Sequence, residues 1–153
     1  MNKAIKLIIS ILLSLSAGAI GSIFTSSSIP TWYSTLNKPV FNPPNYLFGP
    51  VWTVLYILMG ISLYLIWTNK KKNKTALTIF GIQLFLNTLW SIIFFGLKNI
   101  PAAFIEIILL WAAILYTITV FYKINKNAAY ILIPYLAWVS FAAILNFYLL
   151  ILN

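Results

Sequence analysis

The side chains that could carry out chemistry in this sequence are few, and most of them are aromatic. Glu106 is the only acidic residue, and the chain contains no histidine, cysteine or arginine. Hydrolytic and acid–base enzymes need a nucleophile or titratable groups that act together, and metal or haem sites usually need His or Cys ligands. The sequence therefore argues against an enzyme of these classes, and it predicts no metal site and no bound cofactor.

The more informative side chains form three clusters in which large aromatic residues accompany small or polar ones. Residues three or four positions apart share one face of an α-helix. Aromatic walls with a few polar groups suit a flat, mostly apolar ligand, although a single cluster of this kind more often reflects ordinary helix packing than a binding wall. The clusters are Trp52 with Tyr56, Asn87 with Trp90 and Phe94, and Trp138 with Ala142, Leu145 and Asn146.

Two amides and one carboxyl fall inside apolar stretches. An unpaired amide in hydrocarbon is costly, so we expect Asn87 and Asn146 to point toward another helix or a ligand. Glu106 follows Pro101, a residue suited to the first turn of a helix. An intramembrane carboxyl is a functional candidate, but its place near the positive end of a helix dipole equally indicates a structural role, and both interpretations stay open.

The elements that position these residues are membrane-spanning helices. Of the 153 residues, 62% are hydrophobic and only 7% are charged, whereas soluble proteins carry about 25% charged residues. A transmembrane helix needs roughly 20 apolar residues. The sequence therefore predicts an all-α membrane protein, one domain over residues 1–153, whose five helices cover about residues 5–25, 47–67, 76–97, 102–121 and 128–150.

The lysines between these windows are distributed unevenly. Five spans put the N-terminus and the second and fourth connectors on one side with eight lysines, against Lys38 and Lys98 on the other. Because basic residues accumulate on the cytoplasmic side, we expect a cytoplasmic N-terminus and an outer C-terminus. Lysines confined to short connectors do not form a continuous basic face, which argues against nucleic-acid binding.

The first connector, residues 26–46, is much longer than a tight turn. It contains four prolines and four aromatic residues. Such a loop is expected to fold back onto the outer end of the bundle as a lid over a cavity, although Trp and Tyr are also typical of the membrane interface.

Two windows carry further packing signals. Pro134 lies inside the last window and predicts a kink there. In the first window small residues recur every three or four positions, so another backbone can approach closely and we expect this helix inside the bundle. The stripe consists of Ser10, Ser14, Ala17, Gly18, Gly21, Ser22 and Thr25.

Three stretches together resemble the TspO/MBR family, which comprises bacterial tryptophan-rich sensory proteins and the mitochondrial translocator protein, or peripheral-type benzodiazepine receptor. The first is Trp32-Tyr33-x-x-Leu36-x-Lys38-Pro39-x-x-x-Pro43-Pro44, followed by Phe48-Gly49-Pro50-Val51-Trp52-Thr53-x-Leu55-Tyr56-x-x-Met59-Gly60. The second is Asn87-x-x-Trp90-x-x-x-Phe94-Phe95-Gly96. The third is Pro134-Tyr135-Leu136-Ala137-Trp138-Val139-x-Phe141-Ala142-x-x-Leu145-Asn146, so the resemblance covers nearly the whole chain.

This resemblance implies a bacterial membrane protein, commonly a homodimer, with a pocket beneath the first loop for porphyrins such as protoporphyrin IX, sterols, or isoquinoline carboxamide and benzodiazepine ligands. The sterol expectation is weakened because the basic residue that ends the cholesterol motif of animal members is missing after Tyr148. The expected ligand-binding residues are Ser22, Trp32, Tyr33, Lys38, Trp52, Tyr56, Asn87, Trp90, Ile105, Leu109, Trp138, Ala142, Leu145 and Asn146.

Some members of the family are reported to promote light-dependent oxidative breakdown of porphyrin. An indole beside an excited porphyrin can donate an electron, so Trp52 and Trp138 are the candidate catalytic residues. A metal-free tetrapyrrole fits better than haem, because the chain has no His or Cys to ligate iron. Lys38, the only cation in the first connector, or an asparagine of that loop could pair with the propionates. The candidates are Asn37, Asn42 and Asn45.

Two other classes of function remain as alternatives. The protein could transport porphyrin or sterol-like molecules, although no window carries the series of polar groups that ion or proton paths usually need. It could also act as a sensory or structural partner through protein contacts.

Overall fold

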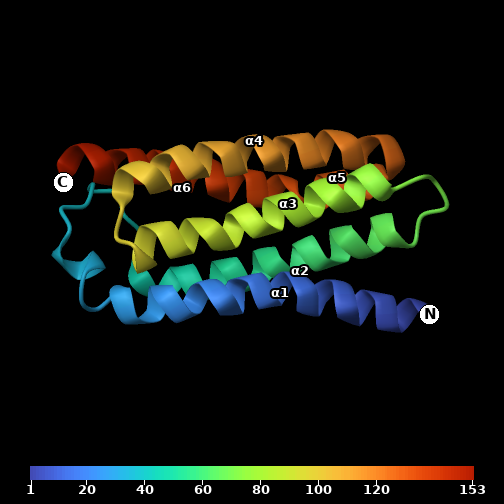
Figure 1. The fold of residues 1–153 in the computed structure, drawn as a ribbon, viewed down its shortest axis with the longest axis horizontal. Helices are drawn as coiled ribbons and strands as arrows, with labels where there is room; N and C mark the ends of the chain where they lie inside the picture. Colours follow the sequence, from blue (N-terminus) through green and yellow to red (C-terminus); the bar gives the residue numbers. More distant parts are fainter.

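The computed structural model describes all residues from 1 to 153 as a bundle of helices with no β-strand (Figure 1). Five helical stretches are long and apolar enough to cross a membrane, which confirms the predicted five-helix architecture. They differ from the predicted windows by at most three residues at either end. Their bounds are Lys3–Ser28, Asn45–Trp67, Lys74–Gly96, Ile100–Ile124 and Lys126–Leu152.

Three of these stretches are composite. The second begins with a 3-10 turn, the third ends in a π-helix, and the fifth is divided into two α-helices. The elements are α1 (Lys3–Ser28), η1 (Tyr33–Thr35), η2 (Asn45–Leu47), α2 (Phe48–Trp67), α3 (Lys74–Ser91), the π-helix η3 (Ile92–Gly96), α4 (Ile100–Ile124), α5 (Lys126–Ile131) and α6 (Ile133–Leu152).

Asparagines in the connectors start three of the helices. The side chains of Asn2, Asn99 and Asn125 each accept a hydrogen bond from a backbone N–H in the first turn of α1, α4 and α5. Pro101 lies in the first turn of α4, where its missing N–H leaves no bond unmade. Pro134 occupies the same place in α6, so the last span is broken just before this proline.

The two ends of the bundle differ in what they expose. The N-terminus and the α2–α3 connector lie at one end, while the C-terminus, the first loop and the α3–α4 connector lie at the other (Figure 1). We call the second the outer end. The opposite end carries eight of the ten lysines, as the sequence predicted for an odd number of spans.

Helix α1 lies at the edge of the bundle, so the expectation of an interior helix was wrong. Its small residues Ser10, Ser14 and Ala17 are buried where α1 packs on α2 and α3. Its other face is apolar and open, with Leu12 60% and Ile23 69% exposed. A stripe of small residues indicates one close contact, and it does not show that the opposite face is covered as well.

Candidate ligand-binding cavity

A cavity of about 450 Å³ lies in the outer half of the bundle, between α1, α2, α3, α4 and α6 and beneath the first loop. Small-molecule sites in proteins usually measure about 300–1,000 Å³. Hydrophobic side chains make up 18 of the 29 lining residues, so the cavity suits a mostly apolar ligand. Ten of the predicted residues line it: Ser22, Tyr33, Trp52, Tyr56, Asn87, Trp90, Trp138, Ala142, Leu145 and Asn146.

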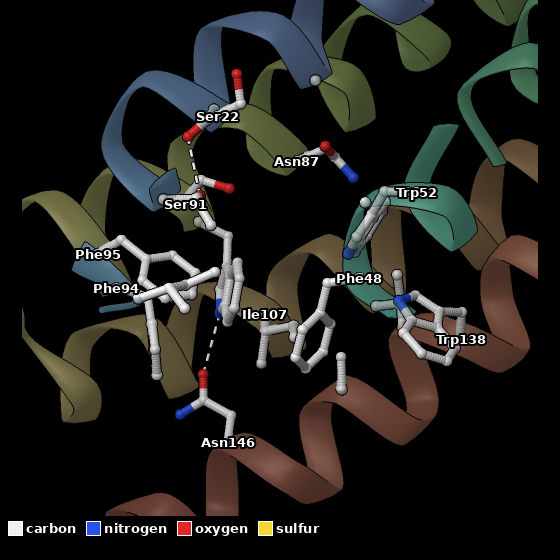
Figure 2. Close-up of a pocket in the computed structure, with 18 of the residues that line it drawn as sticks. Ser22, Phe48, Trp52, Asn87, Ser91, Phe94, Phe95, Ile107, Trp138 and Asn146 are labelled. Atoms are coloured by element: carbon white, nitrogen blue, oxygen red, sulfur yellow. Dashed lines mark hydrogen bonds between the residues drawn. The ribbon is translucent and has the colours of Figure 1, made fainter. Parts of the chain in front are cut away.

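Aromatic rings form two opposite sides of the cavity. Figure 2 shows Trp52 and Trp138 on one side and Phe94 and Phe95 on the other. Trp52 stacks on Tyr56, with ring centroids 5.6 Å apart and an angle of 29° between the planes. Trp52 also meets the Tyr135 ring edge-on at 6.2 Å, so two aromatic neighbours hold the indole in the cavity wall.

A chain of buried hydrogen bonds lies at the inner end of the cavity. The Tyr56 hydroxyl donates to Oδ1 of Asn87 at 2.5 Å, and Nδ2 of Asn87 donates to the Tyr135 hydroxyl at 2.9 Å. Tyr135 in turn donates to Oε1 of Gln83 at 2.8 Å. All four residues are buried, as predicted for Asn87. Because each polar group finds a partner in α2, α3 or α6, the network fixes these three helices against one another.

A second hydrogen bond crosses the cavity wall between α3 and α6. Nε1 of Trp90 donates to Oδ1 of Asn146 at 3.0 Å, the contact that reaches Asn146 in Figure 2. Nδ2 of Asn146 donates to the Ile100 carbonyl at 3.4 Å, which adds the start of α4. The Trp90 ring stacks on Phe94 at 4.9 Å. The predicted inward orientation of Asn146 is therefore confirmed, and its partner is a protein side chain.

The π-helix η3 brings two consecutive phenylalanines to the cavity. Phe94 is 1% and Phe95 8% exposed, and both line the cavity. In an α-helix, the side chains of neighbouring residues point in directions about 100° apart. A π turn contains more residues, so this angle is smaller and two neighbours can face the same side. Phe94 belongs to one of the three predicted aromatic clusters, although it was not among the expected ligand-binding residues, and sequence reasoning missed Phe95 as a lining residue. Phe48, Phe141 and Leu149 were also missed.

A close approach between α1 and α2 seats Tyr56. A Cβ atom added at Gly18 would collide with the Tyr56 ring, so only glycine leaves room for this ring. Ala17, the preceding residue, is 4% exposed. The small-residue stripe thus contributes to the cavity by leaving the Tyr56 hydroxyl in position to reach Asn87.

The first loop, residues 29–44, covers the outer end of the cavity through Tyr33. This side chain is 3% exposed, and its hydroxyl donates to Oδ1 of Asn42 at 2.8 Å. Burial raises the pKa of the Tyr33 phenol above its usual value of 10.0, so the group stays protonated and keeps donating. Nζ of Lys38 lies 4.8 Å from the Tyr33 ring centroid and donates to the Leu36 carbonyl at 3.2 Å.

The same loop is attached to the end of α6. The backbone N–H of Asn37 donates to Oδ1 of Asn153 at 2.9 Å, and Nδ2 of Asn153 donates back to the Asn37 carbonyl at 2.9 Å. Nδ2 of Asn37 also donates to the Leu152 carbonyl at 3.2 Å. The Phe41 ring meets Tyr148 edge-on at 5.1 Å. The contacts of Asn37 and Phe41 therefore attach the middle of the loop to the outer end of α6.

Four predicted residues do not line the cavity. Trp32 and Lys38 belong to the first loop but support Tyr33 and η3 from outside. Ile105 and Leu109 are 65% and 57% exposed on the outer face of α4. Residues that line the cavity from α4 are Ile107 and Leu110, because the helix turns these two positions inward. A shift of one or two residues along a helix is enough to move a side chain from the outer face to the inner face.

Glu106 is buried without a partner. It is 5% exposed, neither carboxyl oxygen has a hydrogen-bond partner, and the residue does not line the cavity. It is the seventh residue of α4, beyond the first turn where the helix dipole acts most strongly. The helix dipole therefore explains the position of this carboxyl less well than the sequence suggested.

Comparison with known proteins gives a consistent result. The profile of the TspO/MBR family matches residues 10–152. The chain is 49% identical over 150 residues to the tryptophan-rich protein TspO of Archaeoglobus fulgidus, covering 97% of each chain. It is 46% identical to the tryptophan-rich protein TspO of Chlorobaculum tepidum, covering 100% of this chain and 99% of the relative. Identity to the Homo sapiens translocator protein is 36% over 132 residues, covering 84% and 78% of the two chains.

Proposed function

Because this chain belongs to the TspO/MBR family, we propose that it is an integral membrane receptor whose cavity binds a porphyrin such as protoporphyrin IX. The observation that carries this proposal is the aromatic lining on two opposite sides of a largely apolar cavity, with Trp52 stacked on Tyr56 and Trp90 on Phe94. Stacking surfaces of this kind favour a flat conjugated ring over a compact ligand of the same volume.

The propionates of the ligand can find a hydrogen-bond donor at the mouth of the cavity. Of the loop residues first considered for the propionates, Asn45 lines the cavity, whereas Lys38, Asn37 and Asn42 make contacts with the protein. We therefore assign the propionate contact to Asn45, whose amide N–H can donate to a carboxylate.

Titration of the protein in lipid nanodiscs with protoporphyrin IX in darkness tests this proposal. Binding should quench tryptophan fluorescence saturably, because four tryptophans lie in or beside the cavity. Replacement of the half-buried lining residue Ala142 by Trp should fill the cavity and abolish saturable quenching. An A112W variant, whose new side chain lies on the exposed face of α4 outside the cavity, is the matched control. Quenching that A142W leaves unchanged would contradict the proposal.

A second candidate activity is light-dependent breakdown of the bound porphyrin. Trp52 and Trp138 both line the cavity, so a porphyrin held there would touch an oxidisable indole. In such a reaction one electron passes from the indole to the photoexcited porphyrin and on to dioxygen, which becomes superoxide. The indole radical cation takes one electron back from the macrocycle, and superoxide combines with the oxidised macrocycle, so that the porphyrin is oxidised, dioxygen is the oxidant and the indole is restored. The enclosed site slows competing reactions with water.

We further propose an orientation in the membrane and an oligomeric state for this receptor. Eight lysines at the inner end support a cytoplasmic N-terminus in a prokaryotic cell membrane, and the family resemblance supports a homodimer. Transport of the same ligand is the alternative function. Flux of porphyrin across proteoliposome membranes would distinguish a transporter from a receptor, and a specific membrane partner would favour a sensory role.

A further inference from the structure

The exposed residues that line the cavity all lie along one gap, which separates α1 from the η2–α2 segment. Lining residues from α3, η3, α4, α6 and the first loop are buried or half-buried. Every exposed lining residue belongs to α1 or to the η2–α2 segment. They are Ala19, Ser22 and Ser26 of α1, and Asn45, Gly49 and Thr53 of the η2–α2 segment.

These six residues form two edges of the gap, and within each edge they are spaced three or four positions apart. Positions 19, 22 and 26 share one face of α1, and positions 45, 49 and 53 share one face of the η2–α2 segment. The edges span about 10 Å along α1 and about 12 Å along the η2–α2 segment. All six side chains are small or short and polar, so no bulky group lies across the gap.

The gap faces lipid. Ile20 and Ile23 beside the α1 edge are 47% and 69% exposed, and Val54 beside the α2 edge is 56% exposed. Apolar residues this exposed in membrane-spanning helices contact acyl chains. The side of the cavity between α1 and α2 is therefore in contact with the hydrocarbon of the bilayer.

The outer end of the cavity, which faces water, is closed by the first loop. Asn37 and Asn153 hold the first loop to α6 through reciprocal hydrogen bonds, and Tyr33 beneath the loop is 3% exposed. Entry from water would require these contacts to break. Entry between α1 and α2 requires only that lipid leave the gap.

We propose that the ligand enters and leaves sideways from the bilayer, through the gap between Ala19, Ser22 and Ser26 of α1 and Asn45, Gly49 and Thr53 of η2–α2, while the first loop stays attached. This inference rests on the proposed function, because it needs a ligand that binds the cavity. It restricts that ligand to molecules that partition into the bilayer, since the route does not lead through bulk water.

A side chain placed across the gap should slow both directions of exchange alike. In Ala19→Phe, association and dissociation of protoporphyrin IX in nanodiscs should each slow by about tenfold, which corresponds to a barrier higher by about 1.4 kcal/mol. Their ratio should stay within about threefold of the original, because Ala19 lies on the α1 edge and the propionates are assigned to Asn45 on the opposite edge. Ala112→Phe, on the exposed face of α4 outside the cavity, should leave both rates unchanged.

A second variant tests the opposite edge independently. Gly49 has open space where a Cβ would lie, so Gly49→Leu adds a side chain at the gap without a clash. Stopped-flow tryptophan quenching should show the same parallel slowing as Ala19→Phe. Unchanged rates in both variants would overturn the inference.

A cross-link tests the loop route. The chain has no cysteine, so N37C/N153C introduces the only two thiols, at positions already joined by hydrogen bonds. Exchange rates should be equal in the thiol form and in a form bridged by a short dithiol-reactive cross-linker. Slower exchange only after bridging would overturn the lateral route. No saturable quenching in the unmodified protein would instead refute the proposed function, which keeps the two failures distinct.

Discussion

The hydroxyl of Tyr56 donates a hydrogen bond of 2.5 Å to Oδ1 of Asn87, across the interface between α2 and α3 at the inner end of the cavity. Tyr56 also stacks on Trp52, and Asn87 continues the hydrogen-bond chain to Tyr135. One pair of residues therefore connects the aromatic wall of the cavity to the packing of three helices. The binding surface and the stability of the bundle depend on the same contact.

Replacement of Tyr56 by Phe should lower the free energy of unfolding by about 1 kcal/mol, because Oδ1 of Asn87 loses its donor in a buried place. Thermal unfolding in detergent measures the change. Tyr116→Phe is the matched control, since Tyr116 is 52% exposed and its hydroxyl makes no hydrogen bond within the protein. Equal melting temperatures for Tyr56→Phe and the original protein would show that this bond contributes no net stability.

Replacement of Trp52 or Trp138 by Phe should leave dark binding of protoporphyrin IX within about threefold, because an aromatic ring remains in the wall. Loss of the porphyrin absorbance under light should slow, because phenylalanine is a much poorer electron donor than indole. Trp67→Phe serves as the control, since Trp67 lies at the inner end of α2 and does not line the cavity. Identical rates of loss in all variants would exclude the two indoles as donors.

Asn45→Leu should weaken binding of protoporphyrin IX by about tenfold or more, the usual cost of a lost hydrogen bond to a charged group. The dimethyl ester, which has no carboxylate, should lose less. Lys38→Met should change the affinity by less than about twofold, because Lys38 lies against Tyr33 and does not line the cavity. A strong effect of Lys38→Met with none of Asn45→Leu would reverse this assignment.

Glu106→Gln should leave porphyrin affinity unchanged, because the carboxyl lies outside the cavity lining. Glu106→Leu should raise the free energy of unfolding by about 1 kcal/mol, since it removes two buried oxygens that have no partner. Affinity from fluorescence titration and stability from thermal unfolding separate the two effects. Reduced affinity of Glu106→Gln at normal yield would instead assign the carboxyl a role in binding.

The helices could be predicted from the sequence because membrane spanning imposes a length and a composition. Each predicted window corresponds to one helical stretch, and the lysines correctly grouped the connectors at two ends. The division of the last span was also foreseeable, since Pro134 cannot donate the backbone hydrogen bond of a helix interior.

The cavity was predicted less completely, because periodicity defines a face of a helix without stating which neighbour that face meets. Ile105 and Leu109 are as apolar as Ile107 and Leu110, and only the packing of α4 decides which pair is inside. Helix α1 was misjudged for the same reason. In a membrane both faces of a helix are apolar, so hydrophobicity does not separate inside from outside.

The π-helix could not be predicted from residue types. Ile92, Ile93, Phe94 and Phe95 are compatible with an ordinary α-helix, and the wider turn is visible only in the backbone. Its effect is to place Phe94 and Phe95 together in the wall opposite Trp52 and Trp138.

The open side of the cavity between α1 and α2 makes the surrounding lipid a competitor. Acyl chains have access to the same edges of small residues as the ligand, at the very high local concentration of a membrane. Every affinity measured for this protein is then an exchange constant between ligand and lipid tail, and it also contains the partition coefficient of the ligand. Chain length, unsaturation and the lipid-to-protein ratio therefore belong among the variables that set how tightly this protein holds its ligand.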